Sequence, residues 1–128
     1  MKKLILIEDN EDMLSLLSDL LSLEGFAVIG YCGKENNAEI MASLREEKPN
    51  LVLLDAHIPG MDSFMLLRDI RQDQEIANTQ ILMSSGMPLE EESQQAGADG
   101  FIAKPFMPDE LIEKIKTMIG NYPNGEKT

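Results

Sequence analysis

Three acidic residues follow two short apolar runs in this chain, and their types and spacing are suited to chemistry. Asp55 ends the apolar run 51–54, and Glu8 and Asp9 follow the apolar run 4–7. Apolar runs of this length are typical of buried strands in a parallel sheet. The carboxyl ends of such strands open on one edge of the sheet, where α/β proteins bind ligands. We therefore expect the three carboxylates to face one crevice.

A crevice with three carboxylates requires a cation. Two carboxylate charges about 4 Å apart repel each other by roughly 4 kcal/mol at an effective dielectric near 20. Oxygen ligands at this density suit Mg²⁺ or a similar hard ion, so the pattern predicts a Mg²⁺ site formed by Glu8, Asp9 and Asp55. Without Asp55, the pair Glu8 and Asp9 would most often be a solvated helix start, where acidic side chains favour the helix dipole.

A hydroxyl and an amine are expected at the ends of two further strands. Ser84 and Ser85 follow one apolar run, and Lys104 follows the run 101–103. A serine hydroxyl can donate to a phosphoryl oxygen, and a lysine ammonium can pair with one. Asp55 can act as a nucleophile toward phosphorus when a bound metal offsets the repulsion between the two groups. The set favours phosphoryl transfer, which depends mostly on positioning and charge neutralisation.

These strand ends belong to an alternating pattern of strands and helices. The alternation predicts an α/β fold with one doubly wound, five-stranded parallel sheet covered by helices on both faces. The strand order 2-1-3-4-5 is taken from the flavodoxin-like fold class, not from the sequence. The strands are predicted at residues 3–8, 26–31, 51–55, 81–84 and 101–103. The helices are predicted near residues 13–21, 35–47, 63–70, 90–96 and 108–119.

Local signals support several of these helices. The first helix has the apolar spacing of a core-facing surface, formed by Met13, Leu16, Leu17, Leu20 and Leu21. Asp62 or Ser63 is suited to cap the third helix, and Pro108 to occupy the first turn of the fifth.

The composition indicates one acidic globular domain. The 128 residues are 43% hydrophobic and carry a net charge of −12. This charge argues against direct nucleic-acid binding and against attraction to an anionic membrane. The single cysteine excludes an internal disulfide and fits a reducing cytoplasm, and we expect no signal peptide or transmembrane segment. Residues 2–120 are predicted to form the domain, and 121–128 a tail or truncated linker.

Four motifs in order resemble the receiver domain of two-component response regulators, of the chemotaxis-regulator type. Each motif alone is weakly specific, but all four at the right strand ends are strongly specific, and the resemblance covers residues 2–120. The motifs are Glu8-Asp9-Asn10, Leu53-Leu54-Asp55 with Pro59-Gly60-Met61-Asp62, Ser85-Gly86 and Lys104-Pro105-Phe106.

The resemblance implies a phosphorylation-dependent switch that uses Mg²⁺. Asp55 would accept a phosphoryl group from a sensor histidine kinase or a histidine phosphotransfer protein. Asp9, Asp55 and the backbone carbonyl of His57 would bind Mg²⁺ directly, and Glu8 would act through a bound water. The side chain of His57 would only flank the site.

The resemblance also implies how the phosphoryl group would be sensed. Ser85 would be the switch hydroxyl, preferred to Ser84 because the small Gly86 follows it. Lys104 would pair with the phosphoryl group and form a cis peptide with Pro105, which proline makes accessible. Phe101 would be the aromatic residue that moves inward on activation.

The implied partners are the kinase or phosphotransfer protein and a downstream effector or fused output domain. The family's output face comprises the fourth helix, fifth strand and fifth helix, and dimerisation on phosphorylation is left open. The spacing from Ser85 to Lys104 is shorter than in familiar members by roughly one helical turn, which predicts a short or partly unwound fourth helix. Met87 cannot orient an attacking water, so we expect self-dephosphorylation to be slow. The resemblance implies a phosphoacceptor and not an enzyme.

Two other functions compete with the switch. A small Mg²⁺-dependent phosphohydrolase would use Asp55 as nucleophile and His57 as general acid and base, but the small size and the spacing of Ser85 and Lys104 fit the switch better. A degenerate receiver would serve only as a docking module, and the intact Asp9, Asp55 and Lys104 argue against it.

Overall fold

The chain folds as five βα units in the predicted order. The computed structural model describes residues 1–120, so the expectation for 121–128 lies outside the described residues. The strands are β1 (Lys3–Ile7), β2 (Ala27–Tyr31), β3 (Leu51–Asp55), β4 (Gln80–Ser85) and β5 (Gly100–Ala103). The helices are α1 (Glu11–Leu23), α2 (Asn37–Glu47), α3 (Ser63–Gln72), α4 (Glu90–Gln95) and α5 (Pro108–Ile119).

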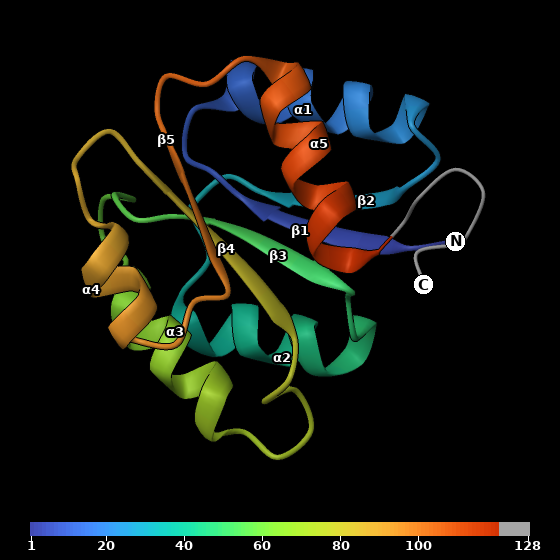
Figure 1. The fold of residues 1–128 in the computed structure, drawn as a ribbon. Helices are drawn as coiled ribbons and strands as arrows, with labels where there is room; N and C mark the ends of the chain where they lie inside the picture. Colours follow the sequence, from blue (N-terminus) through green and yellow to red (C-terminus); the bar gives the residue numbers. More distant parts are fainter. Residues whose placement is uncertain (121–128) are drawn as a thin grey trace.

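The strands form one parallel sheet in the order β2-β1-β3-β4-β5 (Figure 1), which confirms the predicted flavodoxin-like α/β class. Ile7 pairs with Leu54, and Asp55 pairs with Ser84. Because the strands are parallel and in level register, the segments that leave β1, β3, β4 and β5 all emerge at the same edge of the sheet. Within residues 1–120, no helix has the length and apolar character needed to span a bilayer.

The sheet is buried on both faces by helices. Figure 1 shows α1 and α5 on one face and α2, α3 and α4 on the other. Successive residues of a strand point to opposite faces. Leu4 and Leu6 accordingly pack in the core beneath α1 and α5, and Ile5 and Ile7 in the core beneath α2 and α3. The two cores hold the strand ends rigidly in place.

The first helix presents a narrower core-facing surface than the sequence predicts. Leu17 and Leu21 are buried, but Leu16 is 48% exposed, so its predicted core position is wrong. Consecutive residues of an α-helix are separated by about 100° around the axis. Because Leu17 and Leu21 point at the sheet, Leu16 lies on the side of the helix.

Capping side chains set the first residues of two helices. The second helix begins at Asn37, not at residue 35, because Asn36 caps it: its side chain accepts a hydrogen bond from the Glu39 amide, and the Glu39 carboxylate accepts one from the Asn36 amide. Asp62 caps α3 by accepting from the Met65 amide. Ser63, the other candidate cap, is the first residue of that helix.

The fourth unit differs from the prediction in one strand residue. Strand β4 includes Ser85 as its last residue, so Ser84 does not end the strand. The Lys104 amide donates to the Ser85 carbonyl at 2.8 Å and extends the pairing of β4 with β5 to this position. The predicted short fourth helix is confirmed: α4 has 6 residues.

Candidate functional site

The acidic residues predicted at two strand ends lie together. Carboxylate oxygens of Glu8, Asp9 and Asp55 lie within 4.8 Å of one another. Glu8 and Asp55 are 3% and 4% exposed, while Asp9 is open to solvent. Oxygen donors gathered around one point, with one of them accessible from water, match the ligand preference of a hard divalent cation. The donor set therefore fits the Mg²⁺ ion that the sequence predicts.

Lys104 supplies a positive charge to the same cluster. Its Nζ lies 3.0 Å from Glu8 Oε1 and 3.0 Å from Asp55 Oδ2. The predicted cis peptide between Lys104 and Pro105 is present, between the end of β5 and the start of α5. The ammonium offsets part of the repulsion between the two buried carboxylates.

Burial and hydrogen bonding shift the pKa values of Glu8 and Lys104 in opposite directions. Burial raises the pKa of Glu8 above its ordinary value, although hydrogen bonds from Lys104 and from the Asn10 amide partly counter it. Burial alone would lower the pKa of Lys104, but hydrogen bonds to Glu8 and Asp55 outweigh it and raise that pKa. The lysine is therefore held in its charged form, and the charge on Glu8 is only partly compensated.

Asp55 is fixed by its neighbours as well as by Lys104. Its Oδ1 accepts a hydrogen bond from the His57 amide at 3.0 Å. The buried Ser63 hydroxyl donates to the Asp55 carbonyl at 2.7 Å, and the next amide, of Ala56, donates to the Ser84 carbonyl. The sequence does not predict this role of Ser63, for which it indicates only a helix cap. Its position eight residues after Asp55 carries no local signal for this contact.

The Ser85 hydroxyl lies at the end of β4 with two partners. Ser85 is 0% exposed, and its Oγ accepts a hydrogen bond from the Met87 amide at 2.9 Å. The ring of His57 brings Nε2 to 3.0 Å from the same Oγ. The expectation that the His57 side chain only flanks the site therefore misses a direct contact with Ser85.

Phe101 lies away from the acidic cluster. It is half-buried on β5 and packs against the core beneath α2 and α3. It also lines a small hollow of about 120 Å³ with residues of α4 and with Lys114 of α5. The inward movement that the resemblance implies for Phe101 stays a prediction.

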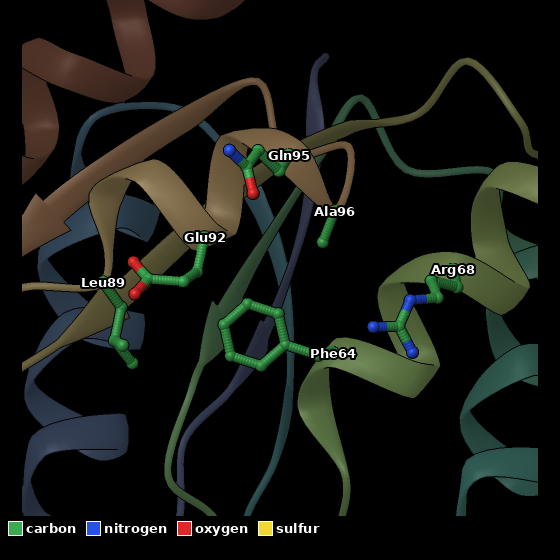
Figure 2. Close-up of a pocket in the computed structure, with 6 residues that line it drawn as sticks. All are labelled: Phe64, Arg68, Leu89, Glu92, Gln95 and Ala96. Carbon is green, nitrogen blue, oxygen red and sulfur yellow. The ribbon is translucent and has the colours of Figure 1, made fainter.

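A separate groove lies between α3 and α4. It has a volume of about 490 Å³, and Figure 2 shows the ring of Phe64 between the two helices, with Arg68 on one side and Leu89 and Glu92 on the other. Gln95 and Ala96 complete its lining. None of the acidic cluster, Ser85 or Lys104 lines this groove, so the chemistry expected from the sequence belongs to the edge of the sheet.

Comparison with known proteins identifies the class that this fold and site define. The family model of the response regulator receiver domain matches residues 4–116. Because the match covers most of the chain, the chain belongs to the response regulator receiver domain family of two-component systems. Members of this family typically act as phosphoacceptors rather than as catalytic enzymes.

Individual relatives agree with this assignment. The chemotaxis protein CheY of Bacillus subtilis is 33% identical over 116 residues, which cover 88% of this chain and 93% of CheY. The transcriptional regulatory protein GltR of Pseudomonas aeruginosa is 32% identical over 121 residues, or 92% of this chain, but the match spans only 49% of GltR. A CheY-like receiver domain protein from Methanospirillum hungatei superposes with a TM-score of 0.82 at 28% identity, with coverage of 94% and 95% of the two chains.

Proposed function

We propose that this chain is a phosphorylation-dependent signalling switch that accepts a phosphoryl group on Asp55. One observation carries the proposal. An oxygen of the nearly buried Asp55 carboxylate lies within 4.8 Å of oxygens of Glu8 and Asp9, and Asp55 Oδ2 lies 3.0 Å from the Lys104 ammonium. A rigid carboxylate beside a cation site and a fixed positive charge suits an acyl phosphate acceptor.

The phosphoryl donor is a histidine kinase or a histidine phosphotransfer protein. A carboxylate oxygen of Asp55 attacks the phosphorus, an O–P bond forms, and the P–N bond of the donor phosphohistidine breaks. Lys104 pairs with the transferred phosphoryl group, and the Ser85 hydroxyl donates a hydrogen bond to one of its oxygens. The match spans 49% of GltR, which supports a fused output domain, and 93% of CheY, which supports a separate effector as the downstream partner.

Mg²⁺ is the cofactor that the acidic cluster would hold. Asp9, Asp55 and the backbone carbonyl of His57 would bind it directly, and Glu8 through a water. When bound, Mg²⁺ neutralises charge on the carboxylates and the phosphoryl oxygens. Phosphorylation replaces the single negative charge of the Asp55 carboxylate with about two on the acyl phosphate, and favours a second conformation, in which Phe101 moves inward. We propose the cytoplasm as its location.

Labelling with acetyl phosphate tests the proposal. In the presence of Mg²⁺, intact-mass spectrometry should detect one added phosphoryl group on the wild type, none on Asp55→Asn, and normal labelling of Asp12→Asn, a matched change at an exposed site. Chelation of Mg²⁺ should abolish labelling. Full labelling of Asp55→Asn would refute the proposal, and multiple turnover of a small phosphoester would favour a phosphohydrolase.

The lifetime of the phosphorylated form is a second readout. Met87, two residues after Ser85, is 54% exposed and has no group that can orient an attacking water. We expect the label to persist after acetyl phosphate is removed. Rapid loss of phosphate from the purified protein would contradict this part of the proposal.

A further inference from the structure

The imidazole ring of His57 reaches across the end of the sheet to Ser85. The backbone amide of His57 donates to Asp55, and its ring places Nε2 3.0 Å from Ser85 Oγ. The transfer chemistry on Asp55 requires only the backbone of His57, not its ring. The phosphoacceptor function alone therefore does not explain the ring contact.

The two partners of Ser85 restrain its hydroxyl. A serine hydroxyl has one proton to donate and two lone pairs to accept with. The Met87 amide occupies one lone pair at 2.9 Å. If His57 Nε2 is the acceptor, it accepts the only proton of the Ser85 hydroxyl. If Nε2 carries a hydrogen, it donates that hydrogen to the second lone pair of Ser85 Oγ. In the tautomer whose Nε2 accepts, the ring therefore holds the proton that a phosphoryl oxygen would need.

We propose that the His57 ring is a positioning residue that holds the Ser85 hydroxyl in the resting form and competes with the phosphoryl group for it. This inference depends on the proposed function, because it assigns a role to the phosphoryl sensor of the same site. A ligand shifts a two-state equilibrium only by its differential affinity for the two states. A hydrogen bond made only in the resting state reduces the apparent affinity for the phosphoryl group.

Removal of the ring contact should therefore strengthen binding of a phosphoryl analogue. The probe is beryllofluoride, titrated in saturating Mg²⁺ and followed by NMR. His57→Phe keeps a planar ring but has no ring nitrogen, and we expect it to bind beryllofluoride about fivefold more tightly than the wild type, the net effect of one hydrogen bond. His57→Gln, whose side-chain amide can again bond to Ser85, should return the affinity toward the wild-type value.

A double-mutant cycle separates this role from a general effect on the fold. Ser85→Ala removes the hydroxyl for which the ring and the analogue compete. In the Ser85→Ala background, we expect His57→Phe to leave beryllofluoride affinity unchanged. The Mg²⁺ affinity of each variant is measured separately and the beryllofluoride titration is run at saturating Mg²⁺, so that a change in Mg²⁺ binding is distinguished from a change in beryllofluoride binding.

Three results would overturn the inference. The first is unchanged or weaker beryllofluoride binding by His57→Phe, and the second is an equal gain in the Ser85→Ala background. The third is a change that is explained entirely by altered Mg²⁺ affinity. Failure of the wild type to bind beryllofluoride would instead refute the phosphoacceptor function, so the two failures are distinguishable.

Discussion

Lys104 Nζ lies 3.0 Å from Asp55 Oδ2, although the two residues are 49 positions apart in the chain. The same ammonium lies 3.0 Å from Glu8 Oε1. The Lys104 ammonium thus neutralises part of the carboxylate charge, which the sequence predicts to be neutralised by a metal ion alone. A cation bound by the carboxylates must share them with Lys104, so the two positive charges oppose each other at this site.

Removal of the Lys104 charge should have opposite effects on the stability of the metal-free protein and on its affinity for Mg²⁺. Lys104→Met keeps much of the apolar stem but leaves the buried carboxylates of Glu8 and Asp55 without their partner. We expect the free energy of unfolding in a chelator to fall by about 1–3 kcal/mol. Mg²⁺ should bind about tenfold more tightly, because a nearby positive charge is absent. Thermal unfolding at increasing Mg²⁺ concentration measures both effects.

Lys34→Met is the matched control for this experiment. Lys34 pairs with Glu11 at 3.8 Å on the surface, where both side chains are more than two-thirds exposed. Exposed pairs of this kind contribute little to stability. Equal Mg²⁺ affinities of the Lys104→Met and Lys34→Met variants would show that Lys104 does not compete with the metal.

The pH dependence of stability should reveal the cost of keeping Glu8 ionised. Burial raises the pKa of Glu8 in the folded protein above its ordinary value of 4.5. A group with a raised folded pKa contributes stability that is complete below the unfolded pKa and is lost as the pH rises through the folded pKa. At pH 7 the ionised Glu8 therefore destabilises the fold. Glu8→Gln should raise the melting temperature at pH 7 by a few degrees, and this gain should shrink as the pH falls toward 4.5.

Glu91→Gln on the exposed surface of α4 is the control for the loss of one negative charge. It should change the melting temperature little at either pH. If Glu8→Gln lowered stability at pH 7, the hydrogen bond from Lys104 to a charged carboxylate would outweigh the desolvation of Glu8. Glu8→Gln also removes a charge from the cation site. It should therefore weaken Mg²⁺ binding while it raises the melting temperature at pH 7.

The predictable part of the fold and site is the part that local patterns determine. Buried parallel strands require continuous apolar runs, so the position of Asp55 at a strand end follows from the run before it. Its proximity to Glu8 follows because parallel strand ends share an edge. The predicted core position of Leu16 is wrong because apolar spacing cannot distinguish the centre of a helix face from its margin.

No local pattern in the sequence predicts contacts between side chains of distant segments. The ring of His57 and the hydroxyl of Ser85 are 28 positions apart. Their contact depends on a rotamer and on the path of the loop after β3, neither of which has a periodic signal. The bridge made by Lys104 depends likewise on the turn after β5. The sequence identified the strand ends that meet, but not which atoms at those ends bond to one another.

Two buried serines should respond to the same substitution in opposite ways. Ser63 Oγ donates to the Asp55 carbonyl at 2.7 Å, whereas Ser93 Oγ, equally buried, has no hydrogen-bond partner within residues 1–120. Ser63→Ala leaves a buried carbonyl without this donor and should lower the free energy of unfolding by about 1–2 kcal/mol. Ser93→Ala removes an unpaired polar atom and should be neutral or stabilising. Urea unfolding of both variants measures the difference.

A comparable loss of stability in both variants would contradict this prediction. It would mean that the packing of the hydroxyl oxygen, and not its hydrogen bond, determines the effect of each change. Ser63→Ala should also slow the labelling of Asp55 by acetyl phosphate, because the Asp55 backbone loses a restraint. Ser93 lies on α4, away from the acidic cluster. Ser93→Ala should therefore leave the labelling of Asp55 unchanged.

Arg71, in the last turn of α3, should be the main anchor of the short α4. Its guanidinium donates to the carbonyls of Gly97, Ala77 and Thr79 at 2.6–2.9 Å and pairs with Asp99 Oδ2 at 2.6 Å. These contacts join α3 to the segment before β4 and to the turn between α4 and β5. A helix of 6 residues cannot be stable without such tertiary support.

Arg71→Ala should therefore loosen α4 selectively as well as destabilise the fold. We expect a loss of about 2–4 kcal/mol in the free energy of unfolding, because several charge-assisted hydrogen bonds disappear together. Arg71→Lys should recover only part of it, since a lysine lacks the planar fork that serves several acceptors at once. Amide hydrogen exchange should accelerate in α4 and β5 more than in β1 and β3.

Arg68→Ala, at an exposed arginine of the same helix, is the control and should change the free energy of unfolding by less than about 0.5 kcal/mol. Uniform acceleration of exchange across the sheet would show that Arg71 supports the whole domain and not α4 in particular.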